Sequence, residues 1–167
     1  EYFFRGISQT DDSPALQGGM DYSIELAKPV SAYIGVRGST VDFNDGGPHT
    51  AHTTNPVPLV LVPPLGVTTE TFDLMPDRSL VKSMVEAGFR VYLVDWGKPE
   101  RKDGHLGLFD YSHDMMGQAL QAVREHSGSK EISLFGWCMG GLLCLLYAGF
   151  GHDKNIRNLV TVASPIW

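Results

Sequence analysis

From residue 57 onward, short apolar runs alternate with amphipathic stretches, and this alternation constrains the fold more than any other feature of the sequence. The apolar runs are too short for buried helices and are rich in β-branched residues, so they predict buried strands. The predicted strands cover residues 57–62, 89–95, 132–135 and 159–163. Strands joined by helical crossovers lie parallel, with helices on both faces of the sheet. The pattern therefore predicts an α/β fold.

Three stretches between these runs predict the crossover helices. The first begins at a polar cap, Asp77 or Ser79, and ends at Gly88. The second covers about residues 111–126 and carries an apolar stripe at helical spacing. The third, Met139–Phe150, is almost wholly apolar. It therefore predicts a helix that packs closely on the sheet.

Residues 1–56 are turn-rich, with only short apolar patches between clusters of Asp, Asn, Gly and Pro. They predict loops with edge strands at about 22–26 and 32–36. We therefore expect two parts, a loop-rich extension over 1–56 and an α/β core over 57–167. The sequence opens without an initiator Met and stops straight after a predicted strand, so we expect it to be an excerpt from a longer chain.

Composition excludes several classes of protein. The chain has 167 residues with 19 acidic and 13 basic side chains, and its formal net charge of −6 argues against a nucleic-acid-binding surface. No apolar run approaches the roughly 20 residues that span a bilayer, and no secretory signal opens the chain, so we expect a cytoplasmic protein. Two cysteines are too few for a disulfide scaffold or a metal site. One of them, Cys144, lies among leucines and is predicted to be core.

The residues that carry chemistry lie between the third predicted strand and the third predicted helix. There Gly136-Trp137-Cys138-Met139-Gly140 reads G-x-C-x-G, the pattern of a nucleophile elbow with Cys in place of Ser. Such a turn holds the nucleophile in a strained backbone conformation, so the residues two before and two after it must be small. Unpaired N–H groups at the start of the helix favour the thiolate. The alternative is that Cys138 is a small buried thiol at an ordinary Gly-rich turn.

Acyl transfer at this turn also needs hydrogen-bond donors for the oxyanion. One donor in this architecture is the backbone N–H after the nucleophile, here Met139, and another comes from the loop after an earlier strand. That loop begins Val62-Pro63-Pro64-Leu65-Gly66. Because proline has no N–H, Leu65 is the first candidate and Gly66 the second. Alternatively, the two prolines only end a strand.

These residues resemble the polyhydroxyalkanoate (polyester) synthases, a family with the α/β-hydrolase fold whose elbow is written G-x-C-x-G-G. The second glycine of that pair is Gly141 here. Further segments look like the family's in the same order, and they lie at 62–64, 72–81, 91–97 and 158–161. The similarity covers about residues 57–167. It implies a partial α/β-hydrolase, with a mostly parallel sheet and helices on both faces, that lacks the C-terminal strands. Residues 66–70 depart from the Asn-bearing segment that usually follows the family's proline pair.

The resemblance implies an acyltransferase. A 3-hydroxyacyl group would pass from its coenzyme A thioester to Cys138, and then onto the hydroxyl of another 3-hydroxyacyl unit, which extends a polyester. Coenzyme A is part of the substrate, and no cofactor or metal is implied. The family's catalytic Asp and His lie beyond Trp167, so we expect the chain as given to be inactive. The similarity is greatest to the short synthases, which implies a partner subunit or a homodimer, and a location at polyester granules.

The histidines present are weaker candidates for the catalytic base. His105 and, less well placed, His113 follow the second predicted strand. Parallel α/β sheets gather their chemistry at the carboxyl ends of the strands, so His105 could reach the site. The remaining histidines are predicted at the opposite end of the sheet, and they are His49, His52, His126 and His152.

Other residues near the same edge have two interpretations each. Asp95 is expected to form a turn or a cap, and a catalytic role is the alternative. Gly66, Trp96 and Trp137 are candidates for the substrate pocket, and the two tryptophans either line an apolar acyl pocket or pack in the core. Arg101 and Lys102 either meet the phosphates of coenzyme A or form a solvated cluster.

Two other functions stay open at this point. The same fold and nucleophile could hand the acyl group to water, as in a thioesterase or an intracellular polyester depolymerase. A non-catalytic member could instead bind granules or a partner. In either case the apolar sheet edge at 159–163 is expected to be covered by further chain or by a partner, because an open apolar edge invites aggregation.

Overall fold

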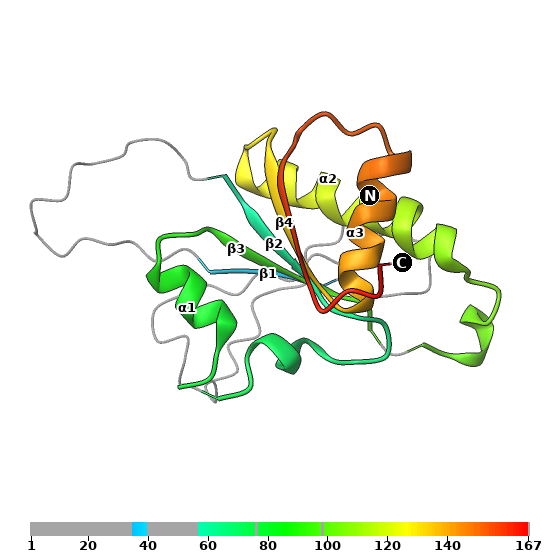
Figure 1. The fold of residues 1–167 in the computed structure, drawn as a ribbon, viewed down its shortest axis with the longest axis horizontal. Coiled ribbons are helices and arrows are strands. Elements are labelled where there is room, and N and C mark those ends of the chain that lie inside the picture. Colours follow the sequence, from blue (N-terminus) through cyan, green and yellow to red (C-terminus); the bar gives the residue numbers. More distant parts are fainter. Residues whose placement is uncertain (1–34, 40–56, 76, 98, 167) are drawn as a thin grey trace, which may run out of the picture.

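The computed structural model describes residues 35–39, 57–75, 77–97 and 99–166. The described strands form one sheet in the order β1-β3-β2-β4-β5 (Figure 1). The strands are β1 (Gly35–Ser39), β2 (Leu59–Val62), β3 (Val91–Asp95), β4 (Ile132–Trp137) and β5 (Ile156–Val162). The neighbours β3, β2, β4 and β5 are parallel, while β1 runs antiparallel to β3 at one edge. The predicted α/β fold with a mostly parallel sheet is confirmed.

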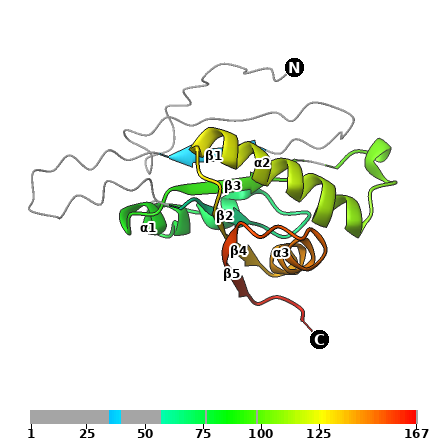
Figure 2. The same ribbon diagram turned by 90° about the horizontal axis from the view of Figure 1, so that it is seen from above.

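Helices cover both faces of this sheet. The helix α1 (Leu80–Glu86) packs on one face, and α2 (Met116–Ser127) and α3 (Met139–Phe150) pack on the other (Figure 1). Seen from above, α3 lies beside β4 and β5, the two strands nearest the elbow (Figure 2). In the described part of the chain, no helix is both long and apolar enough to cross a membrane.

The two faces of the sheet have separate apolar cores because side chains alternate along each strand. In β2, Val60 and Val62 face α2 and α3, whereas Leu59 and Leu61 face α1. All four side chains are buried. A strand covered on both faces has no polar side, which explains why β2 is a continuous apolar run in the sequence.

The structure refines several predicted boundaries. Of the two proposed caps, Ser79 begins α1, since its Oγ accepts a hydrogen bond of 2.8 Å from the Lys82 N–H. The second predicted helix is not uniform, because residues Asp110–Met115 form a wider π-helical turn before α2 begins. β5 begins at Ile156, earlier than predicted. The edge strand predicted at 32–36 overlaps β1, and the one at 22–26 lies outside the described residues.

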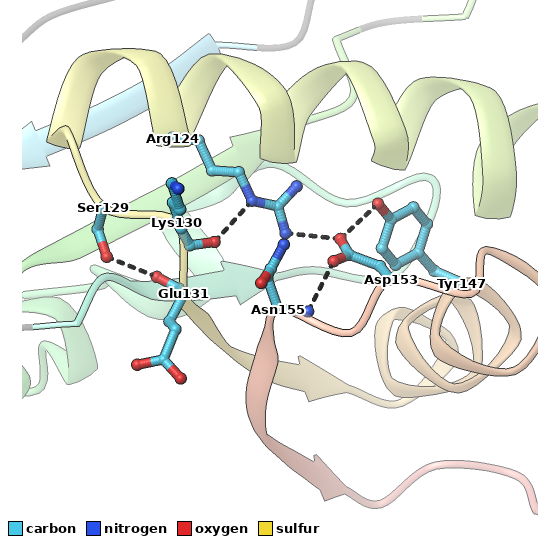
Figure 3. A network of polar contacts seen from close by, with 7 residues as sticks. All are labelled: Arg124, Ser129, Lys130, Glu131, Tyr147, Asp153 and Asn155. Carbon is cyan, nitrogen blue, oxygen red and sulfur yellow. Dashed lines mark hydrogen bonds and ion pairs between the residues drawn. The ribbon is translucent and has the colours of Figure 1, made fainter.

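A partly buried ion pair joins three elements at the amino end of the sheet (Figure 3). The guanidinium of Arg124 at the end of α2 lies 2.6 Å from the carboxylate of Asp153, and the exposed fractions of these side chains are 17% and 9%. The Tyr147 hydroxyl of α3 donates to the same carboxylate at 2.9 Å, and the Asn155 N–H donates at 3.0 Å. We call this set the Arg124–Asp153 cluster. It ties α2 and α3 to the turn that leads into β5.

Asp153→Asn is expected to lower the free energy of unfolding by about 1–3 kcal/mol, because it leaves the partly buried guanidinium of Arg124 without its carboxylate. Burial raises the pKa of the Asp153 carboxyl, but hydrogen bonds from its three partners and the charge of Arg124 outweigh burial and hold the pKa below its ordinary value. The stabilisation is therefore fully present above the unfolded pKa of about 3.9 and is lost as the pH falls through the lower folded pKa. Urea unfolding at pH 7 and at pH 3 measures the difference.

The matched control is Glu131→Gln. Glu131 pairs with Arg157 at 3.2 Å, but both side chains are more than half exposed. Exposed pairs contribute little, so this change is expected to stay within about 0.5 kcal/mol of the parent. A structural role for the Arg124–Asp153 pair would be contradicted by equal effects of the two substitutions. It would also be contradicted if the difference in free energy of unfolding between Asp153→Asn and the parent were as large at pH 3 as at pH 7.

Candidate active site

Cys138 lies at the junction of β4 and α3, where the chain turns sharply from strand to helix (Figure 1). Its φ of 52° and ψ of −121° lie outside the regions that side-chain-bearing residues ordinarily adopt. The Cys138 N–H donates to the Val162 carbonyl at 2.8 Å, which fixes the turn against β5. The residue is partly exposed, not buried. The predicted strained turn is therefore present, and the alternative of a buried thiol at an ordinary turn is not supported.

Three glycines make the sharp turn sterically feasible. A Cβ on Gly136 would clash with the backbone of Gly140 and Gly141, and a Cβ on Gly140 would clash with the Val62 carbonyl. A Cβ on Gly141 would overlap the Oγ of Ser164. The elbow therefore needs glycine before the nucleophile so that β4 and α3 can touch. It needs glycine after the nucleophile so that α3 can approach the end of β2.

The two candidate oxyanion donors have free N–H groups. Among the described residues, neither the Met139 N–H nor the Leu65 N–H donates a hydrogen bond to a protein acceptor. Met139 opens α3, where the first N–H groups of a helix point away from it without partners. The contact between Gly140 and the end of β2 brings the loop that carries Leu65 to the elbow. Gly66, the second candidate, has a φ of 82° and lies in the turn that follows.

The two tryptophans differ in their surroundings. Trp96 is only 5% exposed, lies in the core beside α2 and packs edge-on against Tyr111 with ring centres 5.8 Å apart. Trp137 is 38% exposed, and its ring centre lies 5.8 Å from that of Phe72. Trp137 therefore offers an apolar surface next to Cys138, whereas Trp96 packs beneath the site.

Three of the described histidines have partners away from Cys138. Nδ1 of His105 lies 2.8 Å from the Lys102 carbonyl on an exposed loop, and His113 pairs with its neighbour Asp114. His126 lies at the amino end of the sheet, 3.0 Å from the Tyr92 hydroxyl, and burial together with the Arg90 charge lowers its pKa. In the part of the chain that the structure describes, the Cys138 side chain has no hydrogen-bond partner. His49 and His52 lie outside the described residues.

The remaining predicted residues have structural contacts. The Asp95 carboxylate accepts a 2.9 Å hydrogen bond from the Gly97 N–H, which closes the turn after β3. Lys102 pairs with Glu100 at 2.7 Å, and both side chains are largely exposed. Cys144 is fully buried in the core, and burial raises the pKa of its thiol to about 12. It is therefore not a second nucleophile.

Two residues beside the elbow had no signal in the sequence. Ala163, directly after β5, has a φ of 51°, a strained value for a residue with a Cβ. The next residue, Ser164, places a buried hydroxyl against Gly141, and that hydroxyl has no hydrogen-bond partner among the described residues. Both lie in the loop after β5. The sequence of such a loop indicates neither a strained backbone nor a buried hydroxyl, because both depend on the residues that pack around it.

The chain matches two families of known sequences. Residues 58–166 match the family described as alpha/beta hydrolase fold, and residues 1–57 match a family described as bacterial protein of unknown function. Among solved structures, Cfl2 from Burkholderia cenocepacia superposes with a TM-score of 0.58 at 14% identity, covering 99% of this chain and 46% of that one. A carboxylesterase from Nitrososphaera gargenis superposes with a TM-score of 0.54 at 20% identity, covering 83% of this chain and 44% of that one. These likenesses show the fold.

Curated relatives share more sequence. The poly(3-hydroxyalkanoate) polymerase subunit PhaC of Haloferax mediterranei is 42% identical over 66% of this chain and 22% of its own length. The subunit of the same name from Allochromatium vinosum is 37% identical over 71% of this chain and 33% of its own. The subunit of the same name from Synechocystis is 36% identical over 66% of this chain and 29% of its own length. The chain thus spans about a fifth to a third of the length of these relatives. The matches confirm the resemblance to polyester synthases seen in the sequence.

Proposed function

The chain belongs to the alpha/beta hydrolase fold family, and from this premise we propose that it carries the nucleophile of a polyhydroxyalkanoate synthase-like acyltransferase. The acyl donor is a 3-hydroxyacyl thioester of coenzyme A, and the acceptor is the hydroxyl of another 3-hydroxyacyl unit. One observation supports this most strongly. A partly exposed cysteine occupies the strained position of the elbow, directly before the Met139 N–H, which has no protein acceptor among the described residues.

The proposed reaction has two steps. In the first, the Cys138 sulfur attacks the thioester carbonyl, the bond to the coenzyme A sulfur breaks, and the proton of the Cys138 thiol goes through a base to the leaving thiolate. The N–H groups of Met139 and Leu65 bind the oxyanion that forms in between. In the second, the acceptor hydroxyl attacks the new thioester and loses its proton to the base, and the Cys138 sulfur leaves. Exchange between two thioesters is nearly thermoneutral, so the oxoester product makes the second step the downhill one.

The base is supplied from outside the described part of the chain. The Cys138 thiol and the acceptor hydroxyl must each lose a proton, so a general base such as histidine is needed for both steps. None of the described histidines bonds to Cys138. We therefore place the histidine and its carboxylate partner in further chain of the full-length protein. Its relatives are named polymerase subunits, and a partner subunit is part of the same proposal.

Product analysis tests the proposal. The full-length protein that contains this chain is incubated with 3-hydroxybutyryl-coenzyme A, and the acyl product is separated by chain length. We expect oligomers or polymer to account for most of the coenzyme A released. Free 3-hydroxybutyrate in equal amount to coenzyme A would identify a hydrolase instead. No release of coenzyme A at all would favour a binding module without catalysis.

A further inference from the structure

The loop that carries the candidate oxyanion donor Leu65 is anchored by one buried hydrogen bond. The indole Nε1–H of Trp96, directly after β3, donates to the Pro63 carbonyl, directly after β2, at 2.9 Å. Both groups are shielded from water, and 33 residues separate them along the chain. A hydrogen bond in such surroundings is strong and holds its acceptor in one orientation, because no water competes for the carbonyl.

The orientation of the Pro63 carbonyl is passed on along the chain. Pro64 follows, and its ring locks φ near −65°, while the peptide bonds on either side of it are planar. Between the Pro63 carbonyl and the Leu65 N–H, only ψ of Pro64 can therefore rotate freely. Pro63 and Pro64 therefore form a rigid segment, which we call the stiff arm, with the Pro63 carbonyl at its base and the Leu65 N–H at its tip. Fixing the carbonyl at its base restricts the direction of the N–H at its tip.

The same carbonyl also touches the elbow. A Cβ on Gly140 would lie 2.8 Å from the Pro63 oxygen, so the first turn of α3 packs directly against the base of the arm. Met139, the other oxyanion donor, belongs to that turn. The base of the arm therefore lies between the Trp96 indole and the helix that begins at the nucleophile. Contacts at the base of the arm therefore link the position of the Leu65 N–H to that of the Met139 N–H.

From these contacts we infer that Trp96 is a positioning residue for the oxyanion site, acting through the Pro63 carbonyl on the N–H of Leu65. The inference rests on the proposed function, since it presumes an oxyanion at Cys138. It assigns Trp96 a role other than the acyl pocket that the sequence suggested. The indole is suited to this role because its ring packs in the core against Tyr111.

The test is Trp96→Phe in the full-length protein, which removes the N–H and keeps most of the ring. Two rates are measured, acylation of Cys138 by 3-hydroxybutyryl-coenzyme A and alkylation of Cys138 by iodoacetamide. Acylation passes through an oxyanion, whereas alkylation does not and needs only an accessible thiolate. We expect acylation to fall about 10- to 100-fold, the range for a displaced donor. Alkylation is expected to stay within about two-fold, and the buried Cys144 does not contribute to it.

Tyr92→Phe is the matched control. It also removes one buried polar group from a core aromatic residue, but the Tyr92 hydroxyl bonds to His126 at the opposite end of the sheet. We expect a similar small drop in thermal stability and an unchanged acylation rate. If Trp96→Phe acylates as fast as the parent, the inference is wrong. It is equally wrong if acylation and alkylation fall by the same factor, since Trp96 would then only support the fold.

A second variant covers the case in which Trp96→Phe does not fold. Pro64→Ala frees φ in the stiff arm and leaves the core unchanged, because Pro64 is only partly buried. Acylation is expected to fall at least about ten-fold with alkylation unchanged, and a normal acylation rate would overturn the inference. Failure of the proposed function gives a different result, in which Cys138→Ala still releases coenzyme A.

Discussion

Cys138→Ala is expected to abolish release of coenzyme A from 3-hydroxybutyryl-coenzyme A, with a loss of at least about 10³-fold. Cys138 is the residue at which the strained turn, the free N–H groups and partial exposure coincide. Alanine keeps the small side chain that the turn accepts and removes only the sulfur. The remaining N–H groups can polarise a thioester but cannot accept its acyl group. A thiol-reactive dye that follows free coenzyme A in the full-length protein measures the loss.

Cys144→Ala provides the control for removal of a thiol. Cys144 lies in α3, six residues after Cys138, and its side chain is fully buried in the core. Its loss leaves a small cavity and is expected to lower stability by about 1 kcal/mol, with turnover within about two-fold of the parent. Retained turnover in Cys138→Ala, or equal losses in the two variants, would remove the basis of the proposed function.

Gly136→Ala is expected to destabilise the fold strongly. The added Cβ would run into the backbone of Gly140 and Gly141, which cannot move aside as the end of a flexible side chain could. β4 and α3 would have to separate, and the strained turn between them would lose its support. We expect the free energy of unfolding to fall by about 3 kcal/mol or more, as measured by urea denaturation.

Gly149→Ala is the matched substitution. Gly149 lies in α3, the helix that follows the elbow, and nothing lies within 4 Å of the position that its Cβ would take. In a helix, alanine is more favourable than glycine by about 1 kcal/mol, so this variant is expected to be as stable as the parent or more so. If Gly136→Ala unfolded at the same urea concentration as Gly149→Ala, the close contact of β4 and α3 would not be needed for the elbow.

The fold could be predicted because its main signals are local. Buried parallel strands are apolar on both sides, so residues 59–62 stand out in the sequence, and Gly136 and Gly140 mark the elbow by their fixed spacing from Cys138. These patterns depend only on neighbours along the chain. The sequence also identifies Met139 and Leu65 as candidate oxyanion donors, because one follows the nucleophile and the other follows two residues that cannot donate.

Other features could not be predicted because they depend on contacts made after folding. Apolar periodicity does not distinguish a π-helical turn from an α-helix over one turn, so the widening at Asp110–Met115 was missed. The choice of Ser79 over Asp77 as the cap depends on one hydrogen bond. The role of Trp96 depends on a partner 33 residues away. From the sequence, a tryptophan at a strand end fits a pocket wall as well as a buried anchor.

The location of the Arg124–Asp153 cluster has a consequence for engineering this protein. The cluster joins α2, α3 and the turn before β5 at the amino end of the sheet (Figure 3), whereas Cys138 follows the carboxyl end of β4. Substitutions at distant sites without shared partners usually have additive free energies. Thermal stability and the proposed acyl-chain preference could therefore be improved in separate libraries of variants, one at each end of the sheet. The substitutions selected from the two libraries could then be combined by recombination, with little epistasis between them.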